Sequence, residues 1–183
     1  MLSVCVYCGA ADVAQEYIDL AEAVGKSIAK QGWQVVYGGG NTGLMGAVAE
    51  GALNAGGDVL GIMPTFLVDR ERAHKGLTRL EVVPDMAIRK DRFFKLSDVF
   101  VTLPGGMGTL DELFESITAY QLGLHQGLSF VLNSNGFYNG LLAQMKHQHK
   151  EGFIHQSTET EVPWAFVNTL PQLIESLRHH EKT

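Results

Sequence analysis

A glycine-rich stretch followed by two acids is the part of this sequence best suited to chemistry. Residues 104–112 read Pro-Gly-Gly-Met-Gly-Thr-Leu-Asp-Glu, between an apolar run at 98–103 and a pattern of apolar residues three or four apart that is typical of a helix. A strand, a glycine turn and a helix N-terminus in this order aim free backbone N–H groups and the positive end of a helix dipole at one point. Glycine lets an anion approach the backbone closely. The stretch therefore predicts an anion site, most often for phosphate.

The acids that follow the glycines have two interpretations. Thr109 and Glu112 form the T-x-x-E pattern of a capping box, in which each side chain satisfies a backbone N–H of the other residue. Glu112 could instead act as a catalytic carboxylate beside a bound substrate. The spacing alone favours the capping box.

Two further stretches could assist in binding an anion. Residues 86–92 contain Arg89, Lys90 and Arg92, and clustered cations suit phosphate or carboxylate, although a solvated basic face paired with Asp91 is the alternative. Residues 38–46 begin Gly-Gly-Gly-Asn-Thr-Gly, which formally matches G-x-G-x-x-G.

The second glycine loop favours a mononucleotide over a dinucleotide. A dinucleotide site also needs an acid at the end of the next strand, whereas Asp58 opens that strand and Met63 and Pro64 close it. Neither glycine loop ends in the Gly-Lys-Ser/Thr of a P-loop, which argues against ATP hydrolysis.

Composition and charge limit the partners, location and metal sites that can be expected. The formal net charge is −6 and no Lys/Arg block stands out, so neither nucleic acid nor a membrane is an expected partner. The first residues read as a strand and not as a signal peptide, which predicts a cytoplasmic protein. Cys5 and Cys8 are expected to be buried free thiols, and the histidines lack a ligand spacing, so no metal is predicted.

Alternating strands and helices must position these residues. Apolar runs predict strands at 2–7, 33–37, 58–63, 80–83, 98–103 and 128–132. Helical patterns lie between them, among them 86–96 and 137–149, and a last helix is marked by Phe166, Leu170, Leu173, Ile174 and Leu177. The expected fold is one α/β domain over residues 1–183, a Rossmann-like, doubly wound parallel sheet in a three-layer α/β/α arrangement. Loops 38–46 and 105–109 would line one crevice at the carboxyl ends of its strands.

In combination, these motifs resemble those of the LONELY GUY (LOG) family, cytokinin-activating phosphoribohydrolases often labelled lysine decarboxylase-like. The resemblance covers nearly the whole chain. It rests on Met86-x-x-Arg89-Lys90, on the stretch from Pro104 to Glu112, on residues 38–46, on Pro64-x-x-Leu67-x-x-x-Glu71 and on Gln121-Leu122-Gly123. It implies hydrolysis of the N-glycosidic bond of a nucleoside 5′-monophosphate, such as AMP or a cytokinin riboside 5′-monophosphate, to free base and ribose 5-phosphate.

The resemblance also assigns roles. Arg89 and Glu112 would be the catalytic pair, with Arg89 acting on either the phosphate or the leaving base. Residues expected to contact the substrate are Gly9, Gly39, Gly40, Glu71, Lys90, Gly105, Gly106, Met107, Gly108, Thr109 and Thr118. No cofactor is expected, because nothing marks the Schiff-base lysine that a PLP decarboxylase needs.

Family behaviour and the apolar residues of helix 86–96 predict a homodimer. The family's first loop usually reads Gly-Ser-Ser, whereas this chain has Gly9-Ala10-Ala11 and lacks those hydroxyls. The main alternative to an enzyme is a non-catalytic Rossmann-like carrier of a nucleotide-bearing cofactor, such as a molybdenum-cofactor carrier.

Overall fold

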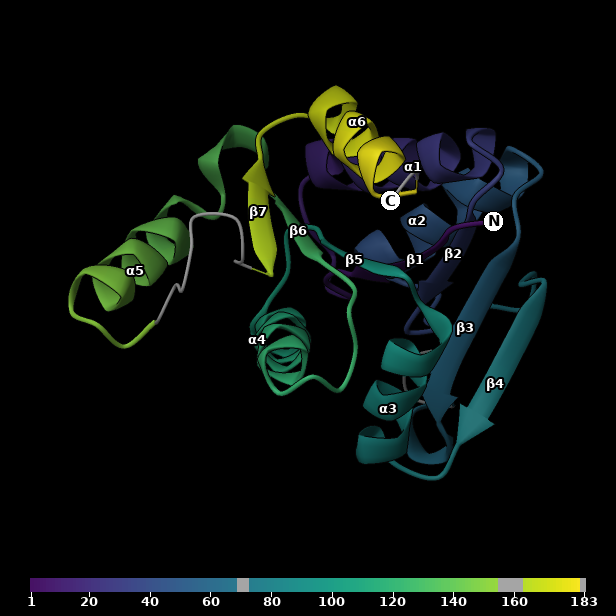
Figure 1. Cartoon of the computed structure of the whole chain (residues 1–183). Helices are drawn as coiled ribbons and strands as arrows, with labels where there is room; N and C mark the ends of the chain where they lie inside the picture. Colours follow the sequence, from purple (N-terminus) through teal and green to yellow (C-terminus); the bar gives the residue numbers. More distant parts are fainter. Residues whose placement is uncertain (69–72, 155–162, 182–183) are drawn as a thin grey trace.

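Strands and helices alternate along the chain. The computed structural model describes residues 1–68, 73–154 and 163–181 (Figure 1). Its strands are β1 (Ser3–Tyr7), β2 (Gln34–Tyr37), β3 (Val59–Pro64), β4 (Arg79–Val83), β5 (Val99–Thr102), β6 (Ser129–Leu132) and β7 (Trp164–Val167). Its α-helices are α1 (Gln15–Lys30), α2 (Gly43–Asn54), α3 (Met86–Leu96), α4 (Met107–Gln121), α5 (Asn139–Lys150) and α6 (Leu170–Glu181), with short 3₁₀ turns η1 (Thr65–Leu67) and η2 (Ser134–Gly136).

The strands form one parallel sheet in the order β4-β3-β2-β1-β5-β6-β7, which confirms the expected Rossmann-like α/β fold. From β1 the chain builds outward to β4, then returns to β5 on the other side of β1. The loops after β1 and β5 therefore lead away on opposite faces. A crevice forms between such loops, and ligands bind there in sheets of this kind.

Alternating residues of each strand pack against different helices. Val4 and Val6 belong to a core cluster with residues of α1, α2 and α6, whereas Cys5 and Tyr7 pack with Phe93 of α3 on the other face. A third cluster joins α4, α5 and β6. Figure 1 shows α1, α2 and α6 on one face of the sheet and α3 and α4 on the other. Both faces are covered, so the strands need the continuous apolar runs seen in the sequence.

The end of the chain differs from the expectation. Strand β7 was not predicted, and Phe166, expected in the last helix, lies in β7 and pairs with Val131 of β6. The last helix begins later, at Leu170. Trp164–Val167 is an apolar run of only four residues, and Phe166 stands four positions before Leu170, so the run also fits the helical spacing of the last helix.

Both cysteines are buried free thiols, as expected, and burial raises the pKa of the Cys8 thiol. Within the described ranges, no helix is both long enough and apolar enough to span a membrane. The cytoplasmic location stays a prediction.

Candidate functional site

Three loops meet at the carboxyl ends of the central strands. The Gly9 N–H, after β1, donates to the Pro104 carbonyl, after β5, over 3.2 Å. The Leu44 N–H at the start of α2 donates to the Gly9 carbonyl over 3.0 Å. The Tyr138 hydroxyl donates to the Leu103 carbonyl over 2.7 Å and so holds the turn that leads into α4. Two parallel strands and two helix N-termini therefore converge at one place.

A cavity of about 350 Å³ opens at this junction. The predicted site residues that line it are Gly9, Arg89, Gly106, Gly108, Thr109 and Glu112. They come from the loop after β1, from α3 and from the first turns of α4. The topology thus brings the predicted catalytic pair and most of the predicted anion loop to one cavity.

Helix α4 presents an open N-terminus to this cavity. Its N-cap is Gly106, and no side chain caps it within the described part of the chain. Thr109 is the third helical residue and Glu112 the sixth, so the capping box suggested by their spacing is wrong. The helix begins at Met107, two residues before Thr109, so Thr109 does not occupy the N-cap position. The backbone N–H groups of the first turn are left to face an anion.

Thr109 helps to shape this turn. Its side chain is buried and folds back over Gly105, where a Cβ would stand 2.1 Å from the Thr109 Oγ1. Glycine at position 105 is needed for this contact. By contrast, a Cβ on Gly106 or Gly108 would meet nothing within 4 Å. Packing within the protein therefore does not explain the glycines at these two positions, whereas an approaching ligand would.

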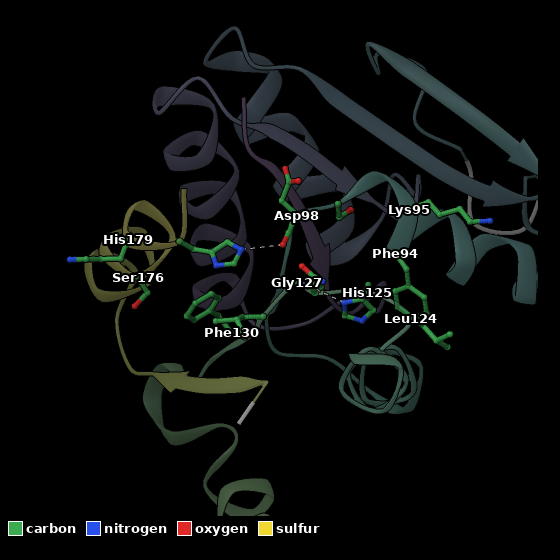
Figure 2. Close-up of a pocket in the computed structure, with 13 residues that line it drawn as sticks. Phe94, Lys95, Asp98, Leu124, His125, Gly127, Phe130, Ser176 and His179 are labelled. Carbon is green, nitrogen blue, oxygen red and sulfur yellow. Dashed lines mark hydrogen bonds between the residues drawn. The ribbon is translucent and has the colours of Figure 1, made fainter. Parts of the chain in front are cut away.

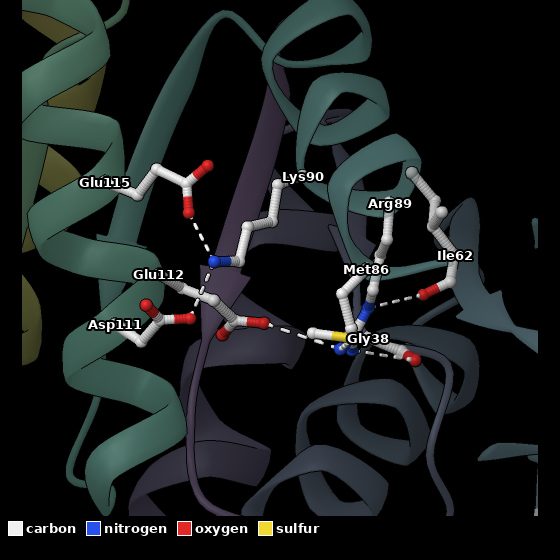
Figure 3. A network of polar contacts seen from close by, with 8 residues as sticks. All are labelled: Gly38, Ile62, Met86, Arg89, Lys90, Asp111, Glu112 and Glu115. Atoms are coloured by element: carbon white, nitrogen blue, oxygen red, sulfur yellow. Dashed lines mark hydrogen bonds and ion pairs between the residues drawn. The ribbon is translucent and has the colours of Figure 1, made fainter. Parts of the chain in front are cut away.

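Two adjacent cations of α3, Arg89 and Lys90, are directed at different carboxylates of α4 (Figure 3). The Arg89 Nη1 lies 3.6 Å from the Glu112 Oε1. The Lys90 Nζ pairs with Asp111 at 2.7 Å and also with Glu115. Burial opposes the charge on Lys90, but hydrogen bonds to Asp111 and Glu115 outweigh it and raise the pKa of this lysine. Lys90 therefore links α3 to α4 as an ammonium ion.

The structure places the other predicted substrate contacts outside the lining of this cavity. Lys90 makes the helix-to-helix ion pairs just described, and Met107 is 84% exposed. Thr118 is exposed near the end of the same helix. A Cβ on Gly39 would face Leu80 and Met63, and the carbonyl of Gly40 accepts the Tyr37 hydroxyl.

Gly105 and Glu71 are the remaining two expected contacts. Gly105 lies under Thr109 and borders a small apolar hollow of about 240 Å³ beside the site. Glu71 lies outside the described residues.

Sequence reasoning missed the apolar part of the lining, which is made by Ala11, Met45, Leu67 and Met86. These residues come from four separate segments of the chain. Met45, Leu67 and Met86 belong to motifs that carry the family resemblance, but their apolar types did not mark them as substrate contacts. They give the cavity apolar walls around a charged pair, as expected of a small-molecule site.

A larger hollow of about 830 Å³ lies at the opposite edge of the sheet, at the amino ends of β5 and β6 (Figure 2). His125 in its wall already uses both ring nitrogens: Nε2 contacts the Ser116 carbonyl at 2.9 Å, and Nδ1 accepts the Gly127 N–H at 3.1 Å. Its ring stacks on Phe94, and burial lowers the pKa of the imidazole. This histidine therefore holds the loop before β6 and is not a reactive group.

Another large hollow, of about 860 Å³, lies beside Asn41, His74 and Leu80. There the His74 Nε2 lies 2.9 Å from the Glu50 Oε1, and its Nδ1 accepts the Gly76 N–H over 3.0 Å, so both ring nitrogens have partners. Neither of the large hollows is lined by residues of the anion loop at 105–109, so the smaller cavity is the candidate site.

The described lining of the cavity at α4 lacks the donors that a metal ion or PLP needs. Among the described residues, no three side chains of His, Cys, Asp or Glu come together as metal ligands. No lysine is part of the described cavity lining, and the nearby Lys90 is held as an ammonium between two carboxylates. A Schiff base needs a neutral amine, so this donor set does not fit a PLP enzyme.

Comparison with known proteins shows which family the chain is similar to. Residues 45–177 match a family model described as "Possible lysine decarboxylase". The chain is 45% identical, over 87% of its length and 82% of the relative's, to a cytokinin riboside 5′-monophosphate phosphoribohydrolase of Rhodococcoides fascians. It is 41% identical to the enzyme of that name called LOG1 in Arabidopsis thaliana, over 82% of this chain and 71% of that one.

Similar solved structures include the molybdenum cofactor carrier protein of Chlamydomonas reinhardtii. Its TM-score is 0.75 and its sequence identity 19%, over 100% of this chain and 99% of that one. At this identity the similarity shows a shared fold.

Proposed function

Because the chain belongs to the LONELY GUY (LOG) family, whose curated relatives are phosphoribohydrolases, we propose that it hydrolyses the N-glycosidic bond of a nucleoside 5′-monophosphate. The products are the free base and ribose 5-phosphate. AMP and cytokinin riboside 5′-monophosphates are the proposed substrates. One observation carries this proposal: Glu112 lines the same cavity as the open N-terminus of α4, so an anion site and a carboxylate face one cavity.

The 5′-phosphate would bind the first-turn N–H groups of α4, around Gly106, Gly108 and Thr109, where the helix dipole favours negative charge. Gly9 faces this turn from the loop after β1. Binding energy from the phosphate, which does not itself react, would hold the ribose against Glu112.

Glu112 would serve the bond-breaking step. Cleavage of an N-glycosidic bond passes through an oxocarbenium-like state, which a carboxylate stabilises electrostatically. The electrons of the bond between C1′ and the base nitrogen leave with the base. Water, oriented by the Glu112 carboxylate, adds its oxygen to C1′, and the proton it loses balances the one that the departing base takes up.

The family model's "lysine decarboxylase" description finds no support in these residues, since no lysine is part of the described lining. The carrier alternative is also less supported. The relatives that share 41–45% identity are named as hydrolases, whereas the carrier shares 19%.

The proposed function is tested by incubating the protein with AMP and with N6-isopentenyladenosine 5′-monophosphate. We expect free base and ribose 5-phosphate in equal amounts, separated by chromatography. Tight binding of both nucleotides without release of base would contradict the hydrolase and favour a carrier.

A homodimer is the proposed assembly. Phe114 and Thr118 of α4 and Leu122 at its C-cap follow one another at spacings of four and are exposed, Leu122 by 70%. On α3, Phe93 is buried within the chain, whereas Ile88 is exposed by 39%. The exposed apolar surface therefore lies mainly on α4, with a smaller part on the helix expected from the sequence to form the interface.

We expect light scattering at micromolar concentration to give twice the mass of the single chain. Replacing Phe114 and Leu122 together by glutamate should yield monomers, because charge would be buried in the interface. Val82→Glu, at an exposed valine of β4, is the control and should leave the mass unchanged. A monomeric wild-type protein would contradict the dimer.

A further inference from the structure

The guanidinium of Arg89 is held by the backbone of two strands. The side chain is 6% exposed. Its Nε donates to the Ile62 carbonyl in β3 over 3.0 Å, and its Nη2 donates to the Gly38 carbonyl, just after β2, over 3.2 Å. The Cζ atom lies 5.3 Å from the centre of the Phe93 ring. The fold itself therefore fixes this cation (Figure 3).

The remaining nitrogen of the guanidinium is directed toward Glu112. Nη1 lies 3.6 Å from the Glu112 Oε1 and 3.7 Å from the Met86 sulfur. A fixed cation at this distance favours the charged form of a carboxylate and restricts its orientation. The neighbouring Lys90 is committed to Asp111 and Glu115, so Arg89 is the cation of α3 that faces Glu112.

Gly38 makes room for the guanidinium. A Cβ at this position would stand 2.2 Å from the Arg89 Nη2 and 3.1 Å from the Met45 sulfur. Gly38 is not among the glycines with a positive φ, so its backbone does not exclude alanine. The requirement for glycine is therefore one of space, and Arg89 is the residue that occupies it.

We propose that Gly38 and Arg89 are positioning residues that hold Glu112 charged and correctly oriented, and that Arg89 acts through Glu112 and not on the 5′-phosphate. This inference rests on the proposed hydrolysis and deepens it. It gives the first glycine of loop 38–46 a role in supporting the catalytic carboxylate, in place of cradling a phosphate. A displacement of about 1 Å at such a group can cost ~10²-fold in rate.

The proposal is tested with Gly38→Ala, Arg89→Ala and the double variant. Gly140→Ala, at an exposed glycine of α5 with nothing within 4 Å of an added Cβ, is the matched control. For each we would measure kcat and KM with AMP, the inhibition constant of ribose 5-phosphate, and the melting temperature. These quantities distinguish the two possible roles of Arg89. If Arg89 bound the phosphate, its replacement would weaken the binding of ribose 5-phosphate. If Arg89 only positions Glu112, its replacement would leave that binding unchanged.

We expect Gly38→Ala and Arg89→Ala each to lower kcat by ~10²-fold, while KM and the inhibition constant change by less than ~3-fold. The double variant should be no slower than Arg89→Ala, because the added methyl group then has no guanidinium to displace. Gly140→Ala should match the wild type.

Three results would overturn the proposal: a tenfold or greater rise in the inhibition constant for Arg89→Ala, a full additional loss in the double variant, or an unchanged kcat for Gly38→Ala. If Gly38→Ala fails to fold, the double variant should fold, and its failure would also overturn the inference. A wild-type protein that releases no base contradicts the proposed function instead. The coupling of positions 38 and 89 is then judged from the melting temperatures, where additive effects would overturn it.

Discussion

Glu112→Gln is expected to fold normally and bind AMP, but to release adenine ~10²–10⁴-fold more slowly than the wild type. Glutamine keeps the shape of the side chain and removes its charge, which the developing oxocarbenium requires. The loss corresponds to about 3–5 kcal/mol of transition-state stabilisation. Adenine release at saturating AMP, together with calorimetric binding, would separate turnover from affinity.

Glu115→Gln is the matched control for this substitution. Glu115 lies on the same helix, pairs with Lys90 and is not part of the described cavity lining. It undergoes the same chemical change, and its activity should stay within ~3-fold of the wild type, since Lys90 keeps its ion pair with Asp111. Near wild-type adenine release by Glu112→Gln would contradict the catalytic role of Glu112. A capping box would not account for the presence of this glutamate either, because Gly106 is the N-cap of α4.

AMP is expected to be cleaved with a kcat/KM ~10³-fold above that of adenosine. The two substrates share base and ribose and differ only in the 5′-phosphate. Two or three charge-assisted hydrogen bonds to the first turn of α4, each worth roughly 1.5–3 kcal/mol, would account for a factor of this size. Initial rates of adenine release from both substrates measure it directly. Equal values would remove the proposed role of residues 105–109.

Gly108→Ala provides a second test of the same site. An added Cβ meets nothing within 4 Å in the protein, and alanine is a better helix former, so stability should be unchanged or slightly higher. The methyl group would nevertheless stand where the phosphate approaches the backbone. We expect AMP cleavage to fall much more than adenosine cleavage, with Gly140→Ala again unaffected. If Gly108→Ala slowed the cleavage of AMP and of adenosine equally, the added methyl group would not act through the 5′-phosphate.

The fold and the location of the site were largely predictable because they depend on local patterns. Strands buried on both faces require continuous apolar runs, and β1, β2, β3 and β5 have them. Two glycine turns placed after such strands must come to the same edge of a parallel sheet. Strand β7 was not predicted because its four apolar residues lie directly before the last helix and Phe166 also fits the helical spacing to Leu170.

Local spacing did not determine how individual side chains are directed. Thr109 and Glu112 match a capping box in sequence, but the helix begins at Met107, ahead of both. Lys90 follows Arg89 directly in the chain, yet the two point to different carboxylates, since successive residues on a helix are about 100° apart. Thr118 lies on an exposed part of the same helix that carries Glu112.

By itself the sequence determined an α/β sheet with a phosphate-type loop at the start of a helix and an acid within reach of it, because these features arise from periodicity and from glycine's lack of a side chain. Only the tertiary structure decided which groups hold the Arg89 side chain. Its partners at Ile62 and Gly38 lie 27 and 51 residues away, and they are backbone carbonyls that any residue type could supply. Such contacts leave no local sequence pattern, since they exist only when parallel strands bring their carboxyl ends together.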